Sequence, residues 1–292
     1  MAKPRLCCHD ASANDLRSSE MKVHHLNCGS MCPLGRRLIN GEGGWLAPAH
    51  MCCHCLLIEG RNGLILVDTG LGTADISNPR RLGLGFNAVV RPRLLMLETA
   101  LHQIRELGLD PRDVRHIVPT HLDLDHAGAL SDFPQAEVHV YAKELQAALT
   151  RPSLQEKARY IPAQWAHGPR WTSHDLKGDR WMGFEAIAAL PDTDEEVLLV
   201  PLTGHTQGHC GVAVRSDEGW LLHCGDAYFH RGEMEPEPDC PIGLKIFQSM
   251  VQMNGADRIA NQGRLRQLKQ AHGAEITLFC AHDPVELAHL SQ

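Results

Sequence analysis

Apolar residues occur along the chain in short runs, and polar or glycine-containing turns separate these runs. Met21–Leu26, Met51–Ile58, Leu64–Val67 and Glu137–Tyr141 are examples, and the third follows a turn at Gly63. Short apolar runs that are bounded in this way are typical of strands. The pattern therefore predicts a sheet protein with several short strands.

Other segments have the spacing of helices. Apolar residues recur at helical intervals in Glu98–Leu107, and Gly108 then provides a stop. Ala142–Leu149 is a second predicted helix. A third, basic helix is marked by Ile259, Leu265 and Leu268. Strands and helices alternate without an internal repeat, which predicts a mixed α/β (α+β) fold.

The most informative segment, Thr120–Gly128, comes directly after the apolar run His116–Pro119. It holds four side chains that can bind a metal within six positions, namely His121, Asp123, Asp125 and His126. Imidazole nitrogens and carboxylate oxygens together suit Zn, Mn, Fe or Co. The alternative is a solvated turn in which Asp125 caps the next helix.

Three further apolar runs end in the same kind of residue. His205 and His209 follow Val197–Val200, Asp226 follows a run that begins at Leu221, and His282 follows Ile276–Phe279. Strands that deliver such residues from one edge of a sheet can present a site on their loops. With 19 histidines in the chain, one alone means little, but the repeated order favours a metal site.

These motifs resemble those of the metallo-β-lactamase-fold hydrolases. The ordered matches are Val67–Gly70, Thr120–Gly128, Gly204–Thr206, Gly225–Asp226 and His282, so the resemblance covers the chain from Met21 onward. It implies a four-layer αββα sandwich. It also implies two divalent transition metals at the sheet edge, zinc above all, with Mn, Fe or Co as alternatives.

The resemblance also implies roles for individual residues. His121 and His205 would bind the first metal, Asp226 would bridge both, and the second would take Asp125, His126 and His282. Asp68 would orient a ligand imidazole, and Thr206 would support the site from behind. The family usually has a histidine at the place of Asp123. A carboxylate there either binds the first metal or points away and leaves that metal weakly held.

A metal-bridging hydroxide would then attack a lactone or carboxylic ester. Asp125 would move the proton, and Tyr228 would donate a hydrogen bond to the oxyanion. The segment around Asp226 and His282 looks most like the quorum-quenching lactonases, which open acyl-homoserine lactones. A thioester or a phosphodiester is the alternative substrate, and a metal-binding protein without hydrolase activity is the alternative outside the enzymes.

Substrate contacts are expected from two irregular regions and from the residues after Asp226. Leu71–Leu97 is long enough to be a lid or a binding loop. Trp165 and Trp171 either form an apolar wall beside the metals or belong to a small core under a loop. Phe229 and His230 lie close enough in sequence to Asp226 to reach a substrate.

Length and composition agree with one domain over residues 21–292, which the resemblance implies is a hydrolase, and residues 1–20 are expected to be a flexible tail. The net charge of −7 argues against a nucleic-acid partner, and no apolar run is long enough to cross a membrane. Eleven cysteines without a regular spacing favour buried thiols in a reducing, cytoplasmic setting. The expected partner is a small-molecule substrate, and monomer and homodimer both remain open.

Overall fold

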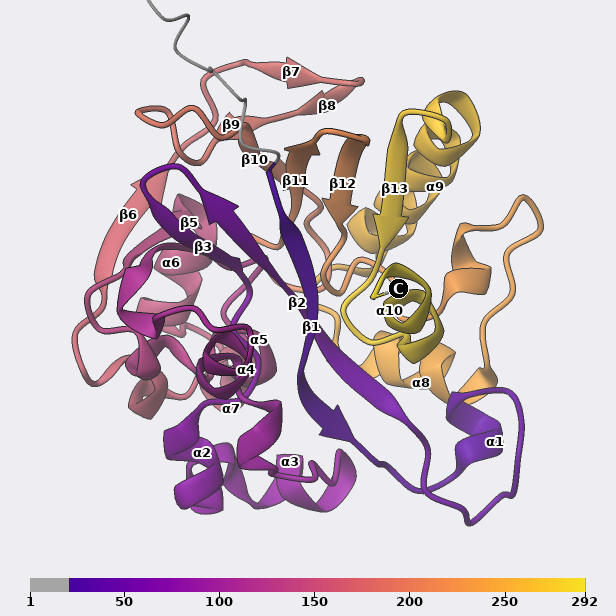
Figure 1. Cartoon of the computed structure of the whole chain (residues 1–292). Helices are drawn as coiled ribbons and strands as arrows, with labels where there is room; N and C mark the ends of the chain where they lie inside the picture. The colour runs from indigo at the N-terminus through magenta and orange to yellow at the C-terminus, as the bar shows by residue number, and fades with distance from the viewer. Residues whose placement is uncertain (1–20, 292) are drawn as a thin grey trace, which may run out of the picture.

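The computed structural model describes residues 21–291, and its strands form two main sheets. The first sheet has the order β1 (Val23–Met31), β2 (Met51–Gly60), β3 (Gly63–Val67), β4 (Val114–Val118), β5 (Glu137–Tyr141) and β6 (Arg170–His174). The second has the order β13 (Ile276–Phe279), β12 (Gly219–His223), β11 (Cys210–Ser216), β10 (Val197–Pro201) and β9 (Ile187–Ala188). Figure 1 shows the two sheets as separate groups of strands, with the yellow helix α9 beyond β13. A small hairpin joins β7 (Arg180–Trp181) to β8 (Phe184–Glu185).

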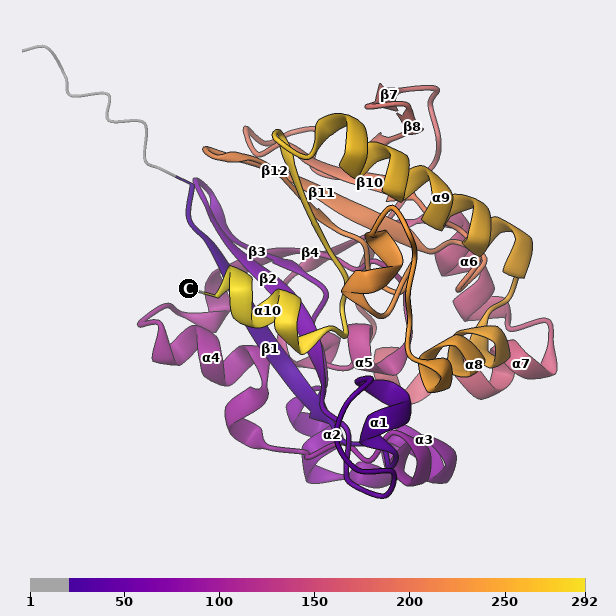
Figure 2. The ribbon, with the colours of Figure 1, turned by 90° about the vertical axis from the view of Figure 1, so that its right-hand side faces the viewer.

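Helices lie in the connections and on the outer faces of the sheets. In chain order they are α1 (Arg36–Ile39), α2 (Thr73–Ser77), α3 (Gly83–Val89), α4 (Ala100–Glu106), α5 (Leu124–Ala127), α6 (Ala142–Thr150), α7 (Leu154–Arg159), α8 (Ile242–Val251), α9 (Gly255–His272) and α10 (Pro284–Leu290). The longest, α9, runs along the outer side of the second sheet (Figure 2).

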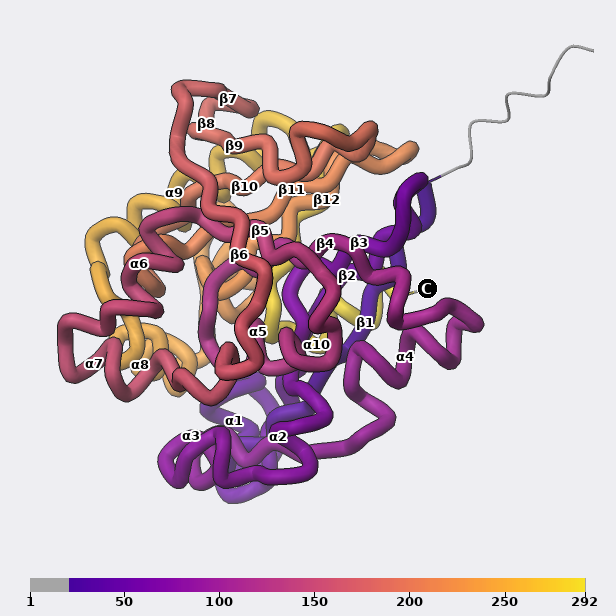
Figure 3. The backbone as a smooth tube through the Cα atoms, turned by 90° about the vertical axis from the view of Figure 1, so that its left-hand side faces the viewer, coloured from indigo at the N-terminus to yellow at the C-terminus, as the bar shows by residue number. Residues whose placement is uncertain are grey.

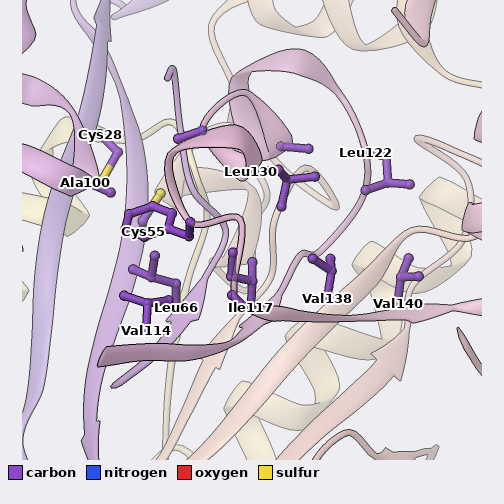
Figure 4. Close-up of a cluster of buried hydrophobic side chains, with 14 of the residues drawn as sticks. Cys28, Cys55, Leu66, Ala100, Val114, Ile117, Leu122, Leu130, Val138 and Val140 are labelled. Atoms are coloured by element: carbon purple, nitrogen blue, oxygen red, sulfur yellow. The ribbon is translucent and has the colours of Figure 1, made fainter. Parts of the chain in front are cut away.

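Three buried apolar clusters define the layers. On the outer face of the first sheet, Leu66, Ile117 and Val138 pack with Ile104 of α4 and Ala147 of α6. Figure 4 shows part of this cluster. A second cluster fills the space between the sheets, and a third packs Leu265 and Leu268 of α9 against the second sheet. Since each sheet is buried on both faces, the predicted αββα sandwich is confirmed.

Alternation of side chains along the strands explains these layers. Val138 and Val140 of β5 face the helices, whereas Tyr141 belongs to the cluster between the sheets. Side chains of successive strand residues point to opposite faces, so one strand can supply two cores. Burying a side chain of this size contributes about 1.5 to 3 kcal/mol.

Strand direction brings the candidate ligands to one edge. β3, β4 and β5 are mutually parallel, and β12 and β13 are parallel to each other. Asp68 follows β3, and His121 lies three residues after β4. Asp226 and His282 follow β12 and β13 in the same way. The carboxyl ends of parallel strands lie together, so residues far apart in sequence meet there.

The predicted elements agree with the structure in most places. The strand predicted over 137–141 and the helix that starts at 142 occur as expected. The first strand runs past its predicted end at Leu26 to Met31, because it continues to pair with β2 through a register shift. The stretch 71–97 is not a structureless loop, since it contains α2 and α3.

Two sequence predictions concern the ends of the chain and the membrane. The predicted tail, residues 1–20, lies outside the described residues. Within residues 21–291, every helix is too short or too polar to cross a bilayer. The nine cysteines that the structure describes are all free thiols, and eight of them are buried.

Candidate metal centre

Asp68 fixes the orientation of the first ligand loop. The residue sits at the end of β3 with a φ of 56°, a left-handed conformation that only a few non-glycine residues adopt. One carboxylate oxygen accepts from the Thr120 amide at 2.7 Å, and the other accepts from the Thr120 hydroxyl at 2.9 Å and from His126 Nδ1 at 2.8 Å. Asp68 is only 1% exposed, so these contacts are made away from water.

Three imidazoles are held in the same tautomer by such contacts. His126 donates its Nδ1 hydrogen to Asp68 at 2.8 Å, and His282 donates its own to the Cys52 carbonyl at 2.7 Å. The Thr120 hydroxyl already donates to Asp68, so it accepts from His121 Nδ1 at 2.9 Å. With Nδ1 protonated, each neutral ring carries its lone pair on Nε2. This is the arrangement that metal-binding histidines adopt.

These Nε2 atoms, and that of His205, surround the carboxylate of Asp226. Asp226 Oδ1 lies 3.2 Å from His126 Nε2 and 3.0 Å from His282 Nε2. Asp226 Oδ2 lies 3.3 Å from His205 Nε2 and 3.9 Å from His121 Nε2. One carboxylate therefore has two imidazoles on each oxygen, as a ligand shared between two cations would.

Several of these atoms are buried without a hydrogen-bond partner. They are His121 Nε2, His126 Nε2, Asp226 Oδ1 and Asp123 Oδ1. A buried polar atom left unpaired costs about 1 to 3 kcal/mol, and here the unpaired atoms gather around one point. Nitrogen and carboxylate oxygen donors are the set that zinc and its neighbours prefer, so the residues fit a divalent transition metal.

Electrostatics agree with this fit. Burial by itself raises the pKa of Asp226, but the charges of His282 and His126 hold it well below its usual value. Burial lowers the pKa of His126, yet the Asp226 and Asp68 carboxylates raise it well above the ordinary value. Both shifts show that the carboxylates draw positive charge into this buried space.

The second half of the centre lies beside Asp125. Its Oδ2 is 3.7 Å from His282 Nε2. Possible donor atoms of Asp125, His282 and Cys53 all lie within 4.8 Å of one another. Cys53 is one of the cysteines that the sequence favours as buried structural thiols, and its place in the apolar strand β2 gives no sign of this proximity. Burial raises the pKa of the Cys53 thiol well above its usual range.

The first half contains a residue that sequence analysis missed. Donor atoms of His121, Asp123 and His205 form another group within 4.8 Å. Arg159, the last residue of α7, reaches the same place, and its Nη1 lies 2.7 Å from Asp123 Oδ2 and 3.0 Å from His205 Nε2. Asp123 thus faces the site, where it pairs with an arginine.

Two buried residues behind the ligands hold their loops together. Glu144 of α6 accepts from the Leu122 amide and the Tyr160 hydroxyl on one oxygen, and from Thr206 and Gly208 on the other. It therefore joins the loop of His121 to the loop of His205. Thr206 supports the site through this carboxylate.

His209 positions Asp226 itself. Its Nδ1 donates to the Leu202 carbonyl at 3.0 Å, and its Nε2 accepts from the Asp226 amide at 2.9 Å. Gly225 has a φ of 52°, and a Cβ there would lie 2.6 Å from His209 Nε2. Glycine is therefore needed at this turn, because it alone lets Asp226 approach the other ligands.

The structure does not bring Tyr228 into the site, which corrects the sequence prediction. Its side chain is fully buried in the apolar cluster under α9, and its hydroxyl donates to Glu286 at 3.0 Å. The next residue, Phe229, does reach the site. Its ring stacks on His282 with centroids 5.2 Å apart and lies 5.9 Å from His205.

The other predicted substrate residues lie elsewhere. Trp165 and Trp171 pack against the core of the first sheet, so the small-core alternative describes them better than a wall beside the metals. His230 accepts from the Gly232 amide through Nδ1 and caps a short 3-10 helix, Arg231–Met234. Its half-buried ring is used locally.

Comparison with known proteins agrees with the fold and the centre. Residues 53–271 match the model of the metallo-beta-lactamase superfamily. The chain belongs to this superfamily. The match spans β2 to α9 and includes every candidate ligand except His282.

Relatives within the superfamily are hydrolases. The chain is 42% identical over 272 residues to a protein of Mycobacterium tuberculosis named "Probable metallo-hydrolase Rv2300c", covering 93% of this chain and 83% of the relative. It is 26% identical to the N-acyl homoserine lactonase AttM of Azorhizobium caulinodans, over 91% and 94% of the two chains. The superfamily match and these relatives together identify the chain as a metal-dependent hydrolase.

The fold also matches solved structures. A crystal structure of Bacillus thuringiensis AiiA with N-decanoyl-L-homoserine bound at its active site superposes with a TM-score of 0.68. The match covers 92% of this chain and 96% of that one, at 20% sequence identity. At this identity the likeness concerns the fold.

Proposed function

We propose that the protein uses divalent transition metals, zinc in the first place, to hydrolyse a lactone or carboxylic ester. N-acyl homoserine lactones are the substrate class to test first. The observation that carries the proposal is Asp226, whose two oxygens face the Nε2 atoms of four imidazoles. The relative named as an N-acyl homoserine lactonase, which matches nearly the whole chain, supports the substrate class.

The geometry supports the following division of the ligands, which is part of the proposal. Asp226 would be shared between two metal positions. Asp125, His126 and His282 would hold one of them, and His121 and His205 would hold the other together with Asp123. A divalent metal bound there supplies a Lewis acid for the carbonyl and a water acidic enough to attack at neutral pH.

The remaining side chains have simpler tasks. Asp68 and His209 keep ligands in place, and Phe229 covers His282 with an apolar ring. Asp125 is 13% exposed at its side chain, so it can exchange a proton with solvent and substrate.

The test is a hydrolase panel on the metal-loaded full chain, with lactones, carboxylic esters, thioesters and phosphodiesters, before and after chelation. We expect ring opening of acyl-homoserine lactones that chelator abolishes and zinc restores. Asp226→Asn is expected to lose activity and metal. Asp132→Asn is the matched control, because this half-buried carboxylate accepts from the Thr73 amide and hydroxyl, away from the ligands.

Hydrolysis of thioesters or phosphodiesters alone would overturn the substrate class but keep the metal-dependent mechanism. Full activity after complete metal removal would overturn both. So would an Asp226→Asn variant that retains wild-type activity.

A further inference from the structure

The place of one metal is taken by an arginine side chain. Arg159 Nη1 lies 2.7 Å from Asp123 Oδ2 and 3.0 Å from His205 Nε2, and those two ligand atoms are 3.1 Å apart. A guanidinium nitrogen carries two hydrogens and accepts none. Nη1 can therefore donate to both ligands at once. The contact requires the lone pair of His205 Nε2 to point at the arginine, as it would point at a metal.

Arg159 is held in this position by the rest of the structure. Its side chain is only 8% exposed, and its other terminal nitrogen donates to the Val251 carbonyl at the end of α8. Gln155, one turn earlier in α7, donates to the Val251 and Gln252 carbonyls. Figures 2 and 3 show α7 and α8 side by side from two directions. Arg159 is therefore part of a packed contact between two helices.

Helix α7 is itself well anchored. Ser153 caps it, with its hydroxyl accepting from the Glu156 amide while the Glu156 carboxylate accepts from Ser153. Glu156 is 3% exposed. This cap pairs amides that the first turn would otherwise leave free, and so stabilises the helix that carries Arg159.

A metal and this guanidinium exclude each other. Zinc binds imidazole nitrogen and carboxylate oxygen at about 2.0 to 2.2 Å. An ion that touches both Asp123 Oδ2 and His205 Nε2 would occupy nearly the space that Nη1 fills. A metal ion bound to Asp123 and His205 and the guanidinium of Arg159 would also repel each other strongly, because both are positive and the site is buried.

Asp123 explains why the arginine is stable there. The guanidinium of Arg159 is buried beside His205, with its Nη1 3.0 Å from Nε2. A buried positive charge is stable only when a negative charge lies close to it. Asp123 provides this negative charge, because its Oδ2 lies 2.7 Å from Arg159 Nη1. The aspartate that departs from the family's usual histidine is the one that pairs with this arginine.

We propose that Arg159 is the resident cation of the His121–Asp123–His205 group. The protein then binds one metal tightly beside Asp125, His126, Asp226 and His282, and a second metal binds only by displacing Arg159. This inference rests on the proposed function, because it concerns the metals of the same centre. It predicts that the two sites bind metal with unequal affinities, whereas the ligand residues alone predict two sites of similar affinity.

The experiment is a cobalt titration of the metal-free full chain, followed by absorption spectra and by metal analysis after gel filtration. We expect wild type to retain one metal per chain and to take up a second only at much higher concentration. Arg159→Ala should bind the second metal roughly 10- to 100-fold more tightly, the range in which neighbours of metal ligands alter affinity. Arg159→Lys keeps the charge but cannot reproduce the forked contacts, so its affinity for the second metal should fall between those of wild type and Arg159→Ala.

Arg159→Gln provides a second neutral variant with a side chain that still packs, in case the alanine variant folds poorly. Arg81→Ala is the matched control, because Arg81 pairs with the buried Asp75 and touches no ligand. It should leave both affinities unchanged. Two metals bound equally tightly by wild type would overturn the inference and leave the proposed function intact. The inference would also be overturned, and the proposed function kept, if Arg159→Ala and Arg159→Gln bound the second metal no more tightly than wild type does. Absence of metal binding in every variant would overturn the proposed function as well.

Discussion

Glu144 is the residue whose replacement tests how the two ligand loops are held. Its carboxylate is fully buried and accepts four hydrogen bonds, two of them from the backbone amides of Leu122 and Gly208 at 2.9 and 3.1 Å. The other two come from the hydroxyls of Tyr160 and Thr206, at 3.0 and 2.7 Å. An ionised carboxylate can accept all four, whereas an amide of the same shape cannot.

Glu144→Gln keeps the volume and places an NH2 group where one oxygen was. Each side of the carboxylate faces one hydroxyl, of Tyr160 or Thr206, and one backbone N–H, of Leu122 or Gly208. The hydroxyl can turn and accept from the new NH2 group, but the backbone N–H can only donate. Either orientation of the amide therefore leaves one buried N–H unpaired, which costs about 1 to 3 kcal/mol. The remaining bonds lose the help of a full charge, about 1 kcal/mol more. We expect the free energy of unfolding to fall by about 2 to 4 kcal/mol.

Urea unfolding of the metal-free protein measures this change, and an unchanged m-value would show that both states keep their compactness. Metal affinity should also fall, by roughly 10- to 100-fold, because Leu122 adjoins His121 and Thr206 adjoins His205. Asp75→Asn is the matched control. That buried carboxylate bonds Gly72, Arg81 and Gln164, so its loss should lower stability without changing metal affinity. A Glu144→Gln variant within about 1 kcal/mol of wild type would refute the reasoning.

Two other predictions follow from buried groups outside the ligand set. Tyr228→Phe removes the hydrogen bond to Glu286, so it should lower the stability measured by thermal unfolding by about 1 kcal/mol. It should leave kcat and metal content unchanged, and a large loss of kcat would return Tyr228 to the mechanism. His139 accepts from or donates to His116 and His174 in a row across β4, β5 and β6, and burial, then the charge of His116, lowers its pKa to about 4. The unfolded chain therefore takes up this proton first as the pH falls below 6.5, so stability should decline between pH 6.5 and about 4, by up to about 3 kcal/mol in total. His139→Gln should flatten that decline in urea unfolding at stepped pH values, and identical pH profiles for the two proteins would contradict the assignment.

Much of the candidate site could be predicted from sequence because its information is local. A run of apolar residues that ends in His or Asp marks both the strand and the ligand, as at Val118 and His121. The order of these motifs then indicates the fold. The length of a strand is harder to predict from sequence, because it depends on the partner strand. β1 continues to Met31 since it pairs with β2 up to that residue.

The residues that sequence analysis missed act at a distance in the chain. Arg159 is 36 residues from Asp123, and Glu144 is 62 residues from Thr206. No local pattern links either pair. Tyr228 was misplaced for the opposite reason, since closeness in sequence to Asp226 says nothing of direction. In the bend that follows Asp226 these two neighbouring side chains project in different directions, since Phe229 faces His282 while Tyr228 enters the core.

The ligand shell draws on both sheets. His121, Asp123, Asp125 and His126 belong to the loop after β4, whereas His205, Asp226 and His282 follow strands of the second sheet. A metal in this place would be a cross-link between two layers that also meet through apolar side chains and through the hydrogen bonds of Glu144. Metal occupancy and the docking of the sheets are therefore linked equilibria. A metal at 100 times its dissociation constant would strengthen that docking by about 2.7 kcal/mol. Folding of the whole protein is therefore needed to bring all seven candidate ligands together.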